Sequence, residues 1–112
     1  MNHIAVGVAG EQRAVRYLTR LGYKPVAVNT RVGRDELDVI MRDGKSLVFV
    51  EVKTRRTLGG GLPQEAVTPT KLRHITRAAE RYCADSRYVG PWRVDVLAIL
   101  GDQITHLKNI TR

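Results

Sequence analysis

Three side chains in the middle of the chain have the types and spacing of a hydrolytic site. Asp38 lies in the run DVIMRDG, and Glu51 and Lys53 follow in LVFVEVK. These apolar, β-branched runs flank an Asp-Gly dipeptide, which is typical of a hairpin turn, so they predict two paired antiparallel strands. Because side chains two residues apart share a sheet face, Glu51 and Lys53 should project together.

The length of the turn decides how Asp38 faces that pair. A two-residue turn would leave Asp38 diagonal to Glu51, and a four-residue turn, which pairs Arg42 with Leu47, would set it directly opposite. Either register gathers Asp38, Glu51 and Lys53 on one face, whereas a three-residue bulged turn would not. Like charges opposed across strands are destabilising, and a carboxylate on an apolar face is costly unless it is paired or metal-bound. The pattern therefore favours a functional site.

Two carboxylates and a lysine on adjacent strands suit metal-dependent hydrolysis of a phosphodiester. Asp38 and Glu51 would offer the hard oxygen ligands that Mg²⁺ prefers. Lys53 would orient the attacking water or neutralise charge that grows on the phosphate. The alternative is that Glu51 and Lys53 form an exposed salt bridge worth less than about 1 kcal/mol.

The charge balance points to a polyanionic partner. The chain of 112 residues carries 19 Lys and Arg against 11 Asp and Glu, a formal net charge of +8. Nucleic acid fits better than a membrane surface, because no long apolar run or basic amphipathic anchor is present. A ribosome-associated protein with merely basic character is an alternative. The single cysteine, Cys83, excludes an internal disulfide and a Cys-rich zinc site, and we expect a cytoplasmic protein.

Hydrophobic periodicity predicts one domain over residues 1–112 with a mixed α/β (α+β) architecture of order αβββαββ. A Thr-Pro pair at 68–69 has the form of a helix N-cap followed by a first-turn proline. The predicted elements are a helix over 8–21, a strand over 23–29, the hairpin over 38–53, a helix from 68 and strands over 92–100 and 103–110.

Two further features of this layout bear on the site. Glu11 falls on the core-facing stripe of the first helix with Val15 and Leu18, either as a charge favoured near a helix N-terminus or as part of the site. Basic residues flank the glycine run 59–61 and predict a positive rim, with the glycine-rich loop as a flap. The rim comprises Arg55, Arg56, Lys71, Arg73 and Arg77.

At these residues the sequence resembles known nucleases. Asp38 followed by Glu51-Val52-Lys53 looks like the PD-(D/E)xK signature of restriction-endonuclease-like enzymes. The ordered blocks GEQRAVRYLTRLGY, NTRVGRDELDVIMRDG, LVFVEVKTRR, EAVTPTKLRHITRAA and RVDVLAI resemble, more closely, the bacterial YraN-like family of proposed endonucleases. That family is itself similar to archaeal Holliday-junction resolvases.

The resemblance implies a restriction-endonuclease-like fold with Asp38, Glu51 and Lys53 at the catalytic positions. It implies that Glu11 contributes to the metal site, so that the candidate ligands of Mg²⁺ or Mn²⁺ are Asp38, Glu51, Glu11 and Val52. Asp35 departs from the glycine usual in the family, and a carboxylate there could repel phosphate. The candidate contacts to nucleic acid are Arg31, Arg55, Arg56, Lys71, Arg73 and Arg77.

The sequence thus predicts a metal-dependent endodeoxyribonuclease that acts on duplex DNA or on branched recombination and repair DNA. Cutting of branched DNA would favour a homodimer, because it needs two active sites. The alternative is a non-catalytic basic module of the same fold that binds nucleic acid.

Overall fold

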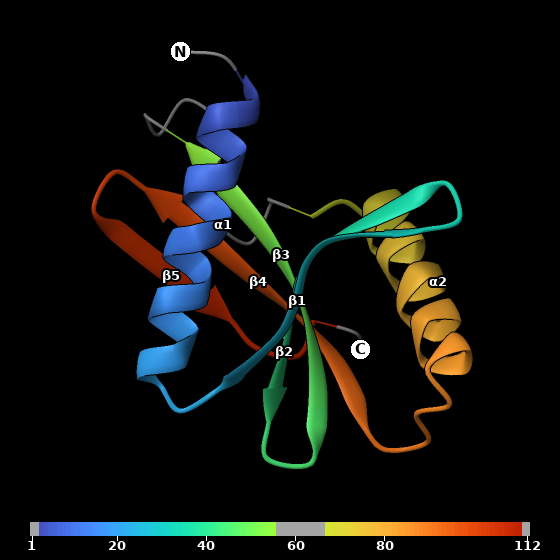
Figure 1. Ribbon diagram of the computed structural model, residues 1–112. Helices are drawn as coiled ribbons and strands as arrows, with labels where there is room; N and C mark the ends of the chain where they lie inside the picture. Colours follow the sequence, from blue (N-terminus) through green and yellow to red (C-terminus); the bar gives the residue numbers. More distant parts are fainter. Residues whose placement is uncertain (1–2, 56–66, 111–112) are drawn as a thin grey trace.

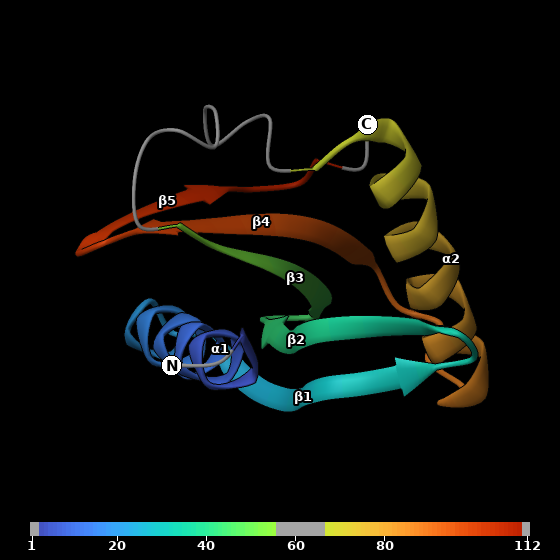
Figure 2. The same ribbon diagram turned by 90° about the horizontal axis from the view of Figure 1, so that it is seen from above.

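The computed structural model describes residues 3–55 and 67–110, which form two helices and one five-stranded sheet (Figures 1 and 2). The element order is αβββαββ, as predicted, and the mixed architecture is compatible with a restriction-endonuclease-like fold. The elements are α1 (His3–Arg20), β1 (Lys24–Val32), β2 (Asp35–Asp43), β3 (Ser46–Arg55), α2 (Pro69–Asp85), β4 (Trp92–Leu100) and β5 (Gln103–Leu107).

The sheet has the strand order β1-β2-β3-β4-β5. Strands β1, β2 and β3 form an antiparallel meander, β3 and β4 are parallel, and β5 returns antiparallel to β4. A parallel neighbour requires a crossover connection, and α2 lies in the segment that joins β3 to β4. The parallel pair therefore forms the centre of the sheet.

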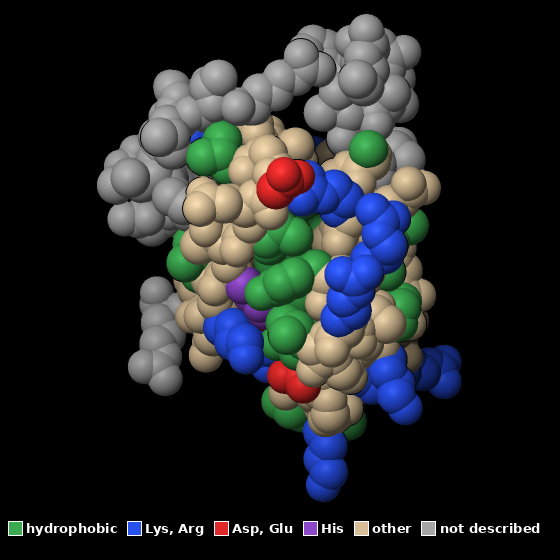
Figure 3. Space-filling view, turned by 90° about the vertical axis from the view of Figure 1, so that its left-hand side faces the viewer, with side chains coloured by type: hydrophobic (Ala, Val, Ile, Leu, Met, Phe, Trp, Pro, Cys, Tyr) green, Lys and Arg blue, Asp and Glu red, His purple; other side chains and the backbone are tan. Residues whose placement is uncertain are grey.

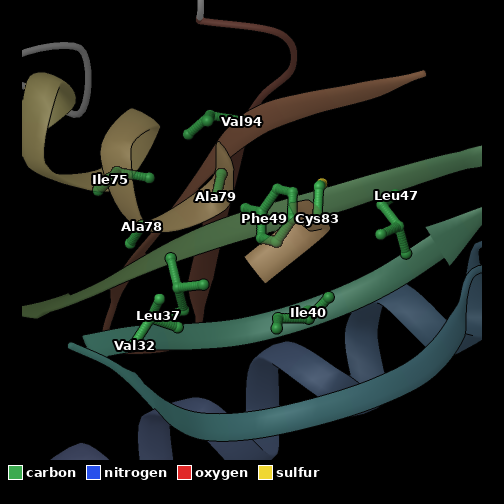
Figure 4. Packing of buried hydrophobic residues seen from close by; sticks show 10 residues of the cluster. All are labelled: Val32, Leu37, Ile40, Leu47, Phe49, Ile75, Ala78, Ala79, Cys83 and Val94. Carbon is green, nitrogen blue, oxygen red and sulfur yellow. The ribbon is translucent and has the colours of Figure 1, made fainter. Parts of the chain in front are cut away.

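Each helix covers its own face of the sheet and closes its own hydrophobic cluster. On the α2 face, Ile40 and Phe49 pack with Ile75, Ala79 and Cys83 (Figure 4). On the α1 face the cluster is formed by Ala14, Leu18, Tyr23, Val39, Met41, Val48, Val50 and Leu97. Successive residues from Val39 to Met41 of β2 and from Leu47 to Val50 of β3 thus enter different clusters, as expected for strands buried on both sides.

The end of α1 departs from the prediction at one residue. Leu21, the last residue of the predicted helix, is 51% exposed, because the helix ends at Arg20 and the chain reverses at Gly22, whose φ is +99°. The amides of Gly22 and Tyr23 donate to the carbonyls of Thr19 and Leu18, as in a glycine C-terminal cap. Tyr23 takes the buried place instead.

Other boundaries shift by a few residues. Helix α1 begins at His3 rather than at residue 8, β1 continues to Val32, and β5 ends at Leu107. The glycine run 59–61 and Arg56 lie outside the described residues, so the predicted flap stays a prediction. Neither described helix is long and apolar enough to cross a membrane.

The face that carries α1 and β5 is basic, as is α2 with Lys71, Arg73 and Arg77. Figure 3 shows a strip of hydrophobic side chains there, bordered along one side by a column of lysine and arginine side chains. Helix α1 carries Arg13, Arg16 and Arg20, of which Arg16 and Arg20 are exposed. Positive charge is therefore present on both faces of the molecule, and any assignment of a DNA-binding face has to distinguish them.

Candidate active site at the fork between β2 and β3

The candidate site lies where β2 separates from β3. The antiparallel ladder pairs Arg42 with Leu47, as in the predicted register that sets Asp38 directly opposite Glu51, but Asp43 also pairs with Ser46, so the turn has two residues, Gly44 and Lys45, and not four. At the other end, the last pair of the ladder is Val39 with Val50. Beyond that pair β2 remains bonded to β1, and β3 remains bonded to β4 as far as Arg55. The sheet is therefore open between β2 and β3 at the position where Asp38 and Glu51 would pair next.

The carboxylate of Asp38 bridges this fork. Its Oδ2 accepts a hydrogen bond of 3.0 Å from the backbone amide of Val52, an amide that would otherwise lack a partner on β2. The neighbouring strand is irregular at the same level: β1 and β2 skip the pair of Asn29 with Asp38, and Asn29 has a φ of +49°. A residue other than glycine in this region is uncommon and is found at functional sites, among other places.

Glu51 lies next to Asp38 and is 7% exposed. Its Oε1 is 2.5 Å from the Nζ of Lys71, which comes from the first turn of α2. A buried carboxylate is stable only when it is paired or bound to a cation. Lys71, predicted as part of the basic rim, is thus the cation that the chain itself supplies to Glu51.

The pair of carboxylates is incompletely neutralised. Burial, followed by the negative charge of Glu51, raises the pKa of Asp38 to about 7 from the ordinary value of 3.8. The hydrogen bond from Val52 and the charge of Lys71 oppose this shift without cancelling it. The fork therefore holds negative charge that a further cation would stabilise.

Glu11 lies on α1, the helix on the face of the sheet opposite α2, and it feels the negative charge of Asp38. Its pKa is raised by burial and then by the charge of Asp38, against a hydrogen bond from Asn29 that lowers it. Helix α1 lies close to the sheet just before Glu11. The distance is so short that a Cβ at Gly10 would clash with the hydroxyl of Thr54. Among the described residues no three acidic, histidine or cysteine side chains stand close enough to form a ready metal cluster, so the convergence of Glu11 with both β-strand carboxylates stays a prediction.

Lys53 follows Glu51 at the interval that places both side chains on the same side of β3. It is half-buried and pairs through its backbone with Ala98 of β4. Within the described residues its ammonium group has no ion pair, in contrast to Lys71. Lys53 is therefore a cation beside the fork that is not committed to a structural contact there.

The other predicted cations have different surroundings. Arg77 binds Asp35 through two hydrogen bonds, and Arg73 donates to the hydroxyl of Thr70 one turn earlier on α2. Arg31 is exposed on β1, where it lies opposite Glu36 of β2. Arg55 ends β3, next to the part of the chain outside the described residues.

Sequence reasoning missed a second buried carboxylate, Asp95 of β4, which is fully buried. Its oxygens lie 3.0 Å from Nε of Arg93, 2.8 Å from Nε2 of His106 and 2.9 Å from the backbone nitrogen of Asn109. Burial alone would raise the pKa of Asp95, but hydrogen bonds from His106, Asn109 and Arg93 hold it below its ordinary value. The cluster ties β4 to β5 and to the C-terminal segment.

Arg93 extends this network along the same face of the sheet to Tyr23 and to the end of β2. Its Nη2 donates to the hydroxyl of Tyr23 at 2.8 Å and to Asp43 at 3.1 Å. The one signal available in the sequence was an aspartate in the middle of the apolar run RVDVLAI. Since the partners of Asp95 lie on β4, β5 and beyond, no local spacing identifies them.

The repulsion at the fork leads to a stability prediction. Asp38→Asn should raise the free energy of unfolding at pH 8 by on the order of 2 kcal/mol, because the amide removes a charge and can still accept from Val52. Since the folded-state pKa is above that of the unfolded chain, the wild type loses stability as the pH rises from about 4 to 7, so the gain should vanish near pH 4. Denaturant unfolding at both pH values measures it, with the exposed Asp102→Asn as the control. A variant less stable than the wild type at pH 8 would contradict the assigned repulsion.

Comparison with known proteins assigns the chain to a family. Residues 10–99 match the model of the uncharacterised protein family UPF0102. Relatives named UPF0102 protein include one from Geobacter sulfurreducens, 57% identical over 95% of this chain and 85% of its own length. Others come from Cytophaga hutchinsonii, 40% identical over 99% of both chains, and Nocardia farcinica, 48% identical over 95% of this chain and 88% of its own length. The chain belongs to the UPF0102 family, in agreement with the YraN-like resemblance of its sequence.

Proposed function

We propose that this protein is a metal-dependent endonuclease that hydrolyses phosphodiester bonds in DNA. The observation that carries the proposal is the pair of adjacent carboxylates, Asp38 and Glu51, at the fork where β2 leaves β3. The net charge of +8 supports a polyanionic substrate. A chromosomal substrate would place the protein in the cytoplasm.

The residues at the fork fit a divalent cation of the Mg²⁺ type. Carboxylates are the hard oxygen ligands that this ion accepts, in small number, alongside water. The raised pKa of Asp38 indicates that the fork holds more negative charge than its own cations neutralise, and a bound metal ion would neutralise it. Asp38 and Glu51 would hold the ion, with Glu11 of α1 and the Val52 position beside them. Mn²⁺ would bind the same oxygen donors.

In this proposal a bound cation supplies Lewis-acid activation of the phosphodiester and of a water molecule. Lys53 stabilises negative charge that develops on the phosphate, because its ammonium group lies on the Glu51 side of β3 and is not committed to an ion pair there. Lys71 neutralises Glu51 at the entrance formed by α2. The surrounding arginines bind the DNA backbone.

A panel of labelled DNA structures tests the proposal. Duplex, flap, four-way-junction and single-stranded DNA are incubated with the protein and Mg²⁺ or Mn²⁺, and calorimetry measures binding of each metal alone. We expect cleavage of at least one structure, and loss of both cleavage and metal binding in Glu51→Gln. DNA binding with no cleavage and no metal binding would instead favour the non-catalytic nucleic-acid-binding module.

The raised pKa of Asp38 predicts how metal affinity depends on pH. Metal ligands must be deprotonated, so at a carboxyl group with a pKa of about 7 the proton competes with the metal ion for the carboxylate oxygens. The apparent association constant for Mg²⁺ should therefore rise about tenfold between pH 6 and pH 8. Calorimetric titrations at the two pH values measure this. An affinity that is equal at both would show that Asp38 is not a ligand.

A further inference from the structure

A cleft of about 200 Å³ separates the β1–β2 turn from the side of α2. In Figure 1 this turn lies beside α2, away from the turn that joins β2 to β3. Arg34 and Asp35 line the cleft from the turn, and Arg77 and Arg81 line it from the helix. Of the charged side chains among the described residues that line it, three are cationic and one is anionic.

One of the three arginines is fixed by the carboxylate. Nε and Nη2 of Arg77 donate to the two oxygens of Asp35 at 2.9 and 2.8 Å. The hydrogen bond from Arg77 holds the pKa of Asp35 below its ordinary value, so Asp35 stays ionised and Arg77 stays oriented. Asp35 therefore holds the turn against α2, which lies beside it in both views (Figures 1 and 2).

The remaining two arginines leave the cleft positive. Three guanidinium groups face one carboxylate, a local balance of +2. Arg34 adds its charge from the turn, and Arg81 is held by Asp85 only at 3.4 Å, with both side chains about two-thirds exposed (67% and 65%). Such an exposed pair is weak, so Arg81 is available to a stronger anion.

Helix geometry relates this cleft to the fork. Lys71, His74, Arg77 and Arg81 are spaced three or four residues apart, so they follow one side of α2. Lys71 contacts Glu51, and Arg81 lies ten residues further on, about 15 Å along the helix axis at 1.5 Å per residue. At about 3.4 Å per nucleotide along the axis of one DNA strand, this corresponds to roughly four nucleotides.

We propose that the Arg34–Arg77–Arg81 cleft binds a backbone phosphate of the DNA, about four nucleotides from the phosphate held at Asp38 and Glu51. This assignment rests on the proposed function, because it takes the fork as the place of cleavage. It makes the α2 face, rather than the α1 face, the surface that the substrate follows. Guanidinium groups suit this role because their forked donors match phosphate oxygens.

Binding measured without catalysis tests the cleft. Fluorescence anisotropy with a labelled duplex in EDTA is recorded over a range of salt concentrations for the wild type and two double variants. Arg34→Ala/Arg81→Ala should weaken binding about tenfold and reduce the slope of log K against log salt by about 1 to 2. Arg16→Ala/Arg20→Ala, which removes the same charge from α1, should change affinity by less than about twofold.

A substitution that removes negative charge from the same cleft distinguishes phosphate binding from a structural role. Asp35→Asn removes the negative charge but keeps an acceptor for Arg77, so it should strengthen DNA binding by about threefold or more at low salt. Damage to the fold would weaken binding in both cleft variants alike. Thermal melts of all variants accompany the measurement.

The outcomes are distinct. If the wild type binds DNA and the α1 double variant loses affinity while the cleft variants do not, the substrate follows the α1 face and the inference is wrong, with the nuclease proposal intact. Weaker binding by Asp35→Asn would also overturn the phosphate assignment. If the wild type binds no DNA at any salt concentration, the proposed function fails first, and the cleft assignment fails with it.

Discussion

Lys53→Ala should lower the rate of DNA cleavage by roughly 10²–10³-fold, because it removes a cation that acts on charge developing in the transition state. The dissociation constant for DNA should change by less than about twofold, since a contact made mainly in the transition state contributes little to ground-state binding. Asp38→Asn, in contrast, should abolish both metal binding and cleavage. Single-turnover cleavage with saturating protein gives the rate, and anisotropy in EDTA gives the affinity.

The two lysines near the fork provide the decisive comparison. Lys71 is bound to Glu51, whereas Lys53 is not committed to an ion pair among the described residues. Lys71→Met should therefore retain most of the rate, and Lys45→Ala, on the distant β2–β3 turn, should retain all of it. If Lys71→Met loses the rate and Lys53→Ala does not, the lysine that acts on the phosphate comes from α2 rather than from β3.

Asp95→Ala should destabilise the protein by about 3–5 kcal/mol, the range found when one partner of a buried ion pair is removed. The substitution removes a fully buried acceptor that Arg93, His106 and the backbone amide of Asn109 share. The melting temperature should fall by on the order of 10–20 °C. Asp85→Ala, which breaks an exposed pair on α2, should cost less than about 1 kcal/mol.

Asp95→Asn keeps the size of the side chain and makes the prediction testable if the alanine variant does not fold. The folded-state pKa of Asp95 is lowered, so its contribution is present above the unfolded value of 3.8 and is lost as the pH falls through the folded value. The difference between the wild type and Asp95→Asn in denaturant unfolding should therefore shrink below pH 4. A difference that is constant between pH 3 and pH 7 would show that the charge of Asp95 does not stabilise the fold.

The strand architecture was predictable because its signals are local. The alternation on either side of Asp43-Gly44 predicts a hairpin, whose turn lies one residue later at Gly44-Lys45, and the glycine has the positive φ of +60° that such a turn uses. Two registers were consistent with the sequence, and the structure selects the one that pairs Arg42 with Leu47. The second helix was equally readable, because the hydroxyl of Thr68 accepts from the amide of Lys71 as an N-cap should.

The charged partnerships were not predictable, because they join residues far apart in the chain. Arg77 and Asp35 are separated by 42 positions, and Arg93 and Tyr23 by 70. Their clustering beside the glycine run placed Lys71 and Arg77 on a positive rim, yet each is paired with a carboxylate that only the packing of α2 on the sheet brings near. Spacing along a strand or helix carries no information on such contacts.

The central parallel pair has a consequence for the order in which the protein folds. Strands β1, β2 and β3 are joined by short turns and can pair early, whereas β4 reaches β3 only after the long crossover that contains α2 has closed. Asp38 and Glu51 therefore meet in the early meander before Lys71 arrives with the helix. A chain in which only this meander has formed would carry its acidic pair without the lysine, so we expect refolding to slow as the pH rises through the range in which Asp38 ionises.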